Sequence, residues 1–76
     1  MEKDTKFLIL FGKRLNEIRT GKNLSYRVLA QLCDVDHSQI SKIEKGNVSI
    51  QLKTVFDLAL ALNVHPKELF NFDLDN

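Results

Sequence analysis

Cysteine, proline and glycine are scarce in this chain, and the usual signals for β-strands are missing. The 76 residues include one cysteine, one proline and three glycines. The lone Cys33 cannot form an internal disulfide, which favours a reducing, cytoplasmic location over secretion. The sequence contains neither an Asn-Gly pair nor an alternation of polar and apolar residues, so nothing in it favours β-hairpins.

Long apolar runs are also absent. The stretch from Phe7 to Phe11 is far too short to span a bilayer, and nothing at the N-terminus resembles a signal peptide. We therefore expect a protein that does not associate with membranes. Because there is no internal repeat, low-complexity stretch or linker, we expect residues 1–76 to form a single domain.

The groupings that carry catalysis are missing too. His37 and His65 are far apart in the sequence, and no Cys/His cluster has the spacing of metal ligands. There is no glycine-rich phosphate-binding loop and no Ser/His/Asp grouping with a pocket around it. We therefore expect no enzymatic activity, no cofactor or metal, and no small-molecule site. Cys33 is interpreted as a small buried hydrophobe.

The composition that is present is typical of a small globular domain with unevenly distributed charge. Hydrophobic residues make up 43% and charged residues 28% of the sequence. The formal net charge is only +1. Residues 1–33 carry seven basic and three acidic side chains, whereas the remainder carries four lysines and seven acids. This asymmetry is compatible with one cationic and one anionic face, and it does not by itself establish nucleic-acid binding.

The spacing of apolar residues predicts an all-α fold. Asp4 or Thr5 would cap the first helix, Ser25 the second and Asp36 the third, while Gly46 is well placed as a left-handed residue that ends a helix. The five expected helices lie at about residues 5–20, 26–33, 37–45, 52–62 and 66–70. The residues expected to face the core of the first, second and fourth helices are Phe7, Phe11, Leu15, Ile18, Val28, Leu29, Leu32 or Cys33, Leu52, Val55, Ala59 and Leu62.

The second and third expected helices have the features of a helix-turn-helix, in which two short helices pack at a steep angle across a tight turn. Ala30 is small where the helices would cross, and Asp34 tolerates the positive φ that we expect in the turn. Ile40 and Ile43 would anchor the third helix on the core. These four residues lie at the mutual spacing that the motif requires.

Several short segments carry a family resemblance: Phe11-Gly12-Lys13-Arg14-Leu15, Ile18-Arg19, Leu24-Ser25, Leu29-Ala30, Ile40-Ser41-Lys42-Ile43-Glu44-Lys45-Gly46, Ala61-Leu62-Asn63-Val64 and Glu68-Leu69-Phe70. Through them the chain resembles the lambda-repressor/Cro type (XRE) helix-turn-helix family, with its motif at about residues 25–45. The resemblance implies a five-helix, lambda-repressor-like DNA-binding domain whose third helix enters the major groove. Asp34 replaces a common glycine of the family and Ile50 a common proline, without endangering the fold.

The resemblance also implies which residues contact DNA. His37, Ser38 and Lys42 occupy base-reading positions, with Gln39 nearby; Lys42 could donate to guanine, and Gln39 could pair with adenine. Without the resemblance these four residues would be interpreted as a solvated polar face. The residues expected at DNA phosphates, near the starts of the second and fourth helices and after the third, are Ser25, Tyr26, Arg27, Lys45, Asn47, Ser49 and Lys53.

Two further sets of residues are expected to be structural. The resemblance implies that Arg19 pairs with Glu44, and we predict a partly buried ion pair that does not contact DNA. Family members bind palindromic operators as two-fold dimers, with half-sites ~34 Å apart. Apolar residues without an obvious place in the monomer core would form the homodimer interface, although isolated exposed apolar residues are also ordinary: Ile9, Phe56, Leu60, Phe70, Phe72 and Leu74.

We therefore expect a sequence-specific regulator of transcription that binds double-stranded DNA, acting as a dimeric repressor or autoregulator. Phage-type repressors, antitoxins and restriction-modification controllers all remain open, as do the operator, the regulated genes and any effector or partner that controls the protein. The alternative is a protein-interaction module of the same fold with little affinity for DNA, which would dock a toxin or another regulator.

Overall fold

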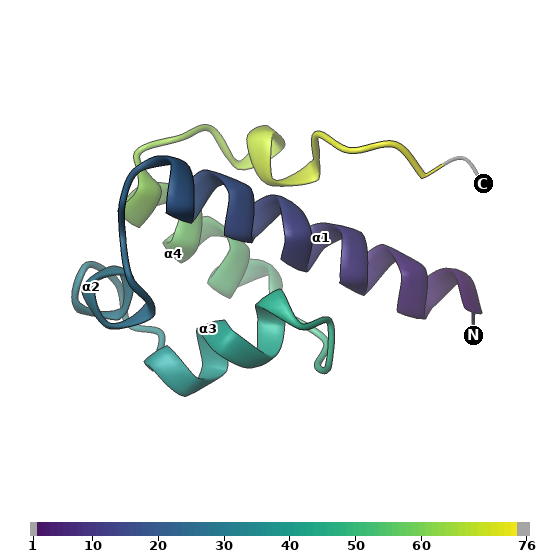
Figure 1. Ribbon diagram of the computed structural model, residues 1–76, viewed down its shortest axis with the longest axis horizontal. Coiled ribbons are helices and arrows are strands. Elements are labelled where there is room, and N and C mark those ends of the chain that lie inside the picture. The colour runs from purple at the N-terminus through teal and green to yellow at the C-terminus, as the bar shows by residue number, and fades with distance from the viewer. Residues whose placement is uncertain (1, 75–76) are drawn as a thin grey trace.

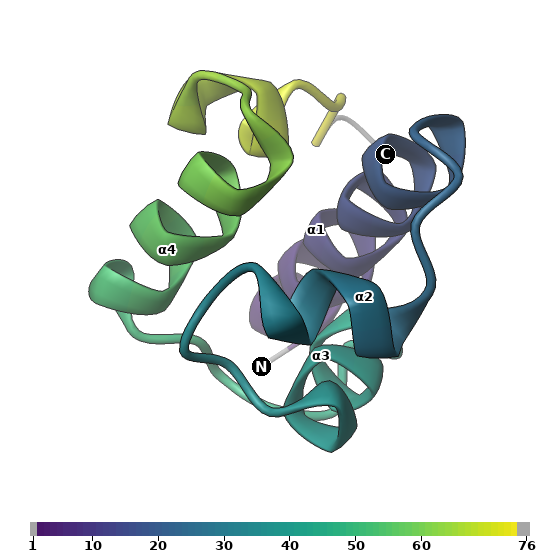
Figure 2. The same ribbon diagram turned by 90° about the vertical axis from the view of Figure 1, so that its left-hand side faces the viewer.

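The computed structural model describes residues 2–74, with side chains from residue 4 onward. Its elements in chain order are the helices α1 (Glu2–Gly21), α2 (Tyr26–Gln31), α3 (His37–Glu44) and α4 (Leu52–Leu62) and the 3-10 helix η1 (Pro66–Phe70). Over these residues the protein is all-helical, as expected. α1 runs along the long axis of the molecule, with α3 on one side of it and η1 on the other (Figure 1). In the view along that axis, α2 and α4 lie on opposite sides of the molecule (Figure 2).

The expected fifth α-helix is wrong, because the segment forms the tighter 3-10 helix η1. Its N–H groups bond to carbonyls three residues back, as in the bond from Glu68 N–H to the His65 carbonyl of 2.9 Å. The His65 ring nitrogen Nδ1 accepts from the Lys67 N–H at 3.0 Å and closes the first turn. Five residues that begin at Pro66 are too few to establish a regular α-helical ladder. The structure therefore has four α-helices among the described residues.

The core is formed by apolar side chains from all five elements, namely Phe11, Leu15, Leu29, Val35, Ile40, Ile43, Val55, Leu58, Ala59, Leu62 and Leu69. Two expected core positions are wrong, because Val28 is 41% exposed and Leu52 is 81% exposed. Of the alternatives Leu32 and Cys33, Leu32 is exposed and Cys33 packs against the core. α2 is only six residues long, and Leu29 is its one fully buried residue, while Tyr26 and Ala30 pack partly buried against the core. Leu52 is the first residue of α4 and lies outside the stripe of buried residues that follows it.

The helix ends agree with expectation at some positions and differ at others. Ser25 caps α2 by accepting the Val28 N–H at 3.1 Å, and Gly46 has the left-handed φ of +74°. Asp34 is not left-handed; the non-glycine residues with positive φ in the described chain are Asn23 and Asn63. Short polar asparagines tolerate this conformation after helices. All residues of the turn between α2 and α3 therefore have negative φ angles.

α1 also begins earlier than expected, at Glu2 rather than after a cap at Asp4 or Thr5. Its first half gains a tertiary partner, because the Phe7 ring stacks on Phe70 with 6.3 Å between the ring centroids. Arg14 ties η1 to α1 by donating from Nε to the Glu68 carbonyl at 2.7 Å. These contacts hold the C-terminal part of the described chain along α1.

Candidate nucleic-acid interface

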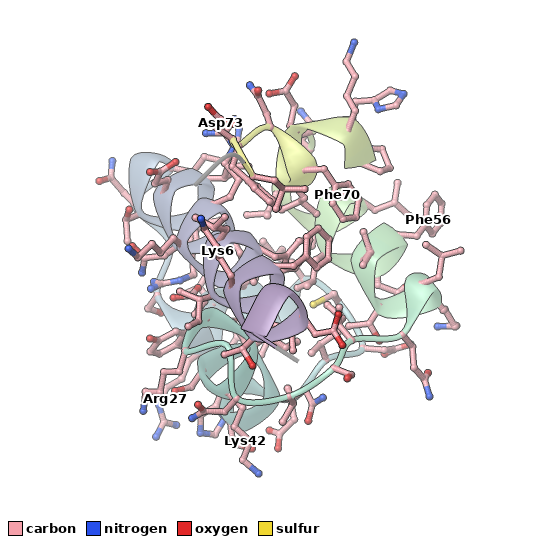
Figure 3. All side chains as sticks on the ribbon, turned by 90° about the vertical axis from the view of Figure 1, so that its right-hand side faces the viewer. Lys6, Arg27, Lys42, Phe56, Phe70 and Asp73 are labelled. Carbon is pink, nitrogen blue, oxygen red and sulfur yellow. The ribbon has the colours of Figure 1, made fainter. Side chains whose placement is uncertain are left out.

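Helix α3, the second helix of the expected helix-turn-helix, is anchored on one side and open on the other. Ile40 and Ile43 are buried in the core, one helical turn apart. The four expected base-reading residues stand on the surface, all of them exposed or partly so: His37, Ser38, Gln39 and Lys42. In Figure 3 Lys42 and Arg27 point from the same side of the molecule, well away from Phe56 and Phe70.

A polar cluster that our sequence interpretation did not foresee occupies the N-terminal end of α3. Asp36 is the N-cap residue, as expected, but its side chain makes no capping bond to the helix backbone. Instead the Ser38 hydroxyl donates to Asp36 Oδ2 at 2.7 Å, and His37 Nδ1 lies 3.4 Å from Asp36 Oδ1. The bond from Ser38 is the main reason that the pKa of Asp36 falls below its ordinary value. The Asp-x-Ser spacing was the available sequence signal for this cluster.

The C-terminal end of α3 is held by an ion pair with α1. Arg19 Nε and Nη2 donate to the two oxygens of the Glu44 carboxylate at 2.6 and 3.1 Å. The two side chains are only 9% and 3% exposed. Asn16 Nδ2 donates a further hydrogen bond to Glu44 at 2.9 Å, which the sequence did not indicate. Two side chains of α1 thus hold the carboxylate at the end of α3.

Arg19 is in turn fixed by three kinds of contact. Its Nη1 donates to the Leu24 carbonyl at 2.6 Å, and its guanidinium lies 4.2 Å from the centre of the Tyr26 ring. The hydrogen bond with Glu44 is the main reason that the pKa of Arg19 is raised further. The guanidinium therefore remains charged and connects α1, the following loop, α2 and α3.

Two glycines let the backbone approach α3 and the turn that follows it. A Cβ built on Gly12 of α1 would lie only 2.5 Å from the Ile43 carbonyl oxygen and would also collide with the Glu44 carbonyl. A Cβ on Gly46 would lie 2.9 Å from the Cα of Ile9. The last turn of α3 is thus packed directly against the backbone of α1.

The expected phosphate contacts fall into two groups. Six of the seven residues are exposed and Tyr26 is half-buried; the first group consists of Arg27, Lys45, Asn47 and Ser49. The other three already have partners within the chain. Ser25 caps α2, and the Tyr26 ring lies against the guanidinium of Arg19. Lys53 Nζ is 2.9 Å from Asp57 Oδ2, and this contact raises the pKa of Lys53.

The residues expected at the homodimer interface also fall into two groups. Phe56 and Leu60, 53% and 63% exposed, lie one turn apart on α4, and Leu74 is exposed as well. Phe70 contacts the Phe11 ring at a centroid distance of 5.3 Å and keeps a partly exposed face. All four residues are thus available to a partner.

The other two interface residues differ from each other: the premise was wrong for Phe72, which has a place in the monomer, whereas Ile9 is 39% exposed, as expected. Phe72 packs on Phe7, with 5.7 Å between the ring centroids, and is half-buried against the core. Ile9 keeps an exposed side and also lies close to the turn at Gly46. Helical spacing alone did not reveal these neighbours.

Other kinds of site find no support among residues 2–74. No group of three or more His, Cys, Asp or Glu side chains there could hold a metal ion. None of the helices in that range is both long and apolar enough to cross a bilayer. Cys33 is half-buried, and its thiol lies 3.3 Å from the Leu29 carbonyl.

Known proteins resemble this chain over most of its length. It is 38% identical over 65 residues to the control protein C.BamHI of Bacillus amyloliquefaciens, an alignment that covers 84% of this chain and 80% of that protein. The restriction-modification controller protein C.AhdI from Aeromonas hydrophila matches with a TM-score of 0.81 and 43% identity, over 83% of this chain and 96% of the other.

Longer regulators match over a part of their length. The HTH-type transcriptional regulator PuuR of Escherichia coli is 40% identical over 60 residues, which are 79% of this chain and 32% of PuuR. An HTH_3 family transcriptional regulator from Vibrio cholerae matches with a TM-score of 0.87 and 27% identity, over 93% of this chain and 40% of that one. Residues 15–69 match the helix-turn-helix family HTH_3. The chain therefore belongs to the HTH_3 helix-turn-helix family, in agreement with the XRE-type resemblance of its sequence.

Proposed function

We propose that this protein is a DNA-binding transcriptional regulator of the restriction-modification controller type. The observation that carries the proposal is the orientation of α3, whose Ile40 and Ile43 are buried in the core while its Ser38 and Lys42 are exposed. The controller type is preferred because C.BamHI and C.AhdI are matched over 80% and 96% of their lengths, whereas PuuR is matched over 32%. Such a regulator acts where the DNA is, so we place it in the cytoplasm.

In this proposal the exposed side of α3 lies in the major groove of double-stranded DNA. His37, Ser38, Gln39 and Lys42 read base edges, which carry the sequence information of the site. Phosphate contacts position the protein without specifying the sequence. The residues proposed to make them are Ser25, Tyr26, Arg27, Lys45, Asn47, Ser49 and Lys53. Neither catalysis nor a cofactor is part of this function.

The proposed active form is a homodimer on a palindromic operator. Phe56 and Leu60 of α4 form the centre of its interface, together with Phe70 and Leu74, because these apolar side chains are exposed. Phe56 and Phe70 lie away from the side that bears Lys42 (Figure 3). Ile9 and Phe72 stay at its margin. Two-fold symmetry of the protein then requires two-fold symmetry of the operator.

Selection of bound duplexes from a random DNA pool tests the proposal directly. A palindromic consensus is expected, and the affinity for it should fall as salt rises, with a log–log slope of about −0.9 for each phosphate contact. If no duplex is enriched, or if binding ignores salt, the protein is instead an interaction module. In that case the exposed apolar residues of α4 would dock a protein partner.

A further inference from the structure

The N-terminal end of α3 presents hydrogen-bond acceptors to its surroundings. A hydroxyl has one proton to donate, and Ser38 donates it to Asp36 Oδ2 at 2.7 Å. What remains free on Ser38 is its lone pairs. An ionised carboxylate carries no proton at all and offers about four lone-pair sites. Asp36 and Ser38 therefore form an acceptor pair at this end of the recognition helix.

The acceptor pair is open to a ligand. The side chain of Asp36 is 70% exposed and makes no capping bond to α3. Ser38 occupies one site on Oδ2 and the His37 ring lies 3.4 Å from Oδ1, so each oxygen keeps a lone pair for a further donor. Like other exposed aspartates, Asp36 is ionised at neutral pH, and its hydrogen bond from Ser38 lowers its pKa further. A free negative charge on a surface that approaches phosphates weakens binding to every DNA sequence, unless a donor on the DNA compensates for it.

Donors on the base edges of the major groove are few. Guanine presents the acceptors N7 and O6, and thymine presents the acceptor O4 with a methyl group. Both repel a carboxylate. Adenine has an amino group, but its acceptor N7 lies beside it, whereas cytosine presents the N4 amino group alone. The base that fits an ionised acceptor pair best is therefore cytosine.

We propose that Asp36, oriented by its hydrogen bond from Ser38, selects a cytosine in each operator half-site by accepting a hydrogen bond from the N4 amino group. This inference rests on the proposed DNA-binding function and adds a base type to it. Asp36 thereby serves as a specificity-determining residue beside His37, Gln39 and Lys42. It also discriminates against other bases, because an unpaired carboxylate next to an acceptor is costly.

The test measures the affinity of the full-length protein for its selected operator and for duplexes in which each base pair is replaced in turn. For the wild type, replacement of one cytosine in each half-site should weaken binding roughly five- to a hundredfold through loss of this contact. For Asp36→Asn the preference at that position should shift to adenine, since an amide pairs with adenine N6 and N7. At all other positions the two proteins should discriminate alike.

Asp34→Asn is the matched control. Asp34 is also exposed and lies in the turn before α3, so this variant changes the net charge by the same amount. It should raise the affinity for all duplexes to a similar extent, without changing the preferred base at any position. A second readout uses a cytosine analogue that lacks the 4-amino group, which should weaken binding of the wild type and leave Asp36→Asn almost unaffected.

The outcomes separate the two proposals. If the wild type enriches no duplex, the DNA-binding function itself is overturned, and the cytosine contact with it. If a consensus emerges but Asp36→Asn changes affinity uniformly, as Asp34→Asn does, only the role of Asp36 is overturned. Circular dichroism melting of both variants should match the wild type, because both side chains are exposed, and it excludes unfolding as the cause of any change.

Discussion

Arg19 in the last turn of α1 donates two hydrogen bonds to the carboxylate of Glu44 in the last turn of α3, and both side chains are withdrawn from solvent. The pair therefore connects the recognition helix to the longest helix of the protein. A buried pair of this kind stabilises orientation more than it adds net stability, but removal of one partner leaves the other charge unpaired.

Glu44→Gln should lower the free energy of unfolding by about 3 kcal/mol, because the buried guanidinium of Arg19 would lose its counter-charge. For a domain of this size the melting temperature should fall by more than roughly 10 °C. Glu17→Gln is the control, since Glu17 pairs with Arg14 at the surface and its side chain is 66% exposed. Equal melting temperatures for Glu44→Gln and the wild type would show that the pair has no structural role.

Gly12→Ala should destabilise the protein by about 1–3 kcal/mol, because its Cβ would collide with the carbonyl oxygens of Ile43 and Glu44. Gly21→Ala provides the comparison within α1: nothing lies within 4 Å of its added Cβ, so stability should be kept or increased. Denaturant unfolding measures both. A loss of the same size in the two variants would contradict the role of this contact, because helix propensity favours alanine over glycine at both positions.

Lys42→Ala should raise the Kd for the selected operator roughly five- to a hundredfold, while binding to unrelated DNA changes little. Arg27→Ala, which we assign to phosphate, should instead weaken binding to all sequences and reduce the slope of the salt dependence by about 0.9. Fluorescence anisotropy titrations over a range of salt concentrations distinguish these patterns. An identical pattern for both variants would contradict the division into base and phosphate contacts.

Leu60→Asp should convert the proposed dimer to a monomer, since a charge on the exposed face of α4 cannot be buried against a second copy. Sedimentation at tens of micromolar measures the change. Leu52→Asp serves as the control, because Leu52 is still more exposed on the same helix but is not one of the proposed interface residues. A wild type that sediments only as a monomer would rule out the interface.

Cys33 should react slowly with iodoacetamide at neutral pH. Burial is the main reason that the pKa of its thiol is raised, so the reactive thiolate is scarce below that pKa, and the side chain is half-buried. The rate should increase as pH rises, and it should increase again when denaturant exposes the thiol. Alkylation as fast in the native as in the unfolded protein would contradict this environment.

Local rules of sequence were sufficient for much of the fold. The spacing of Ile40 and Ile43 placed one side of α3 in the core, Ser25 marked the start of α2, and Gly46 marked the left-handed turn after α3. Each of these features depends on neighbours within one or two helical turns. The family resemblance added the pairing of Arg19 with a residue 25 positions away.

The chain by itself thus determined the helices, the buried stripe of α3 and the polar residues opposite it. Only the tertiary structure decided that Leu52 stays outside the core, that Phe72 packs on Phe7, and that Gly12 meets the backbone of α3. The physical reason is that periodicity states which way a side chain points along one helix, whereas burial depends on what a distant segment places there. The bond between Asp36 and Ser38 is local, and the competing backbone cap is just as local, so the spacing of the residues did not distinguish them; the structure has the bond to Ser38.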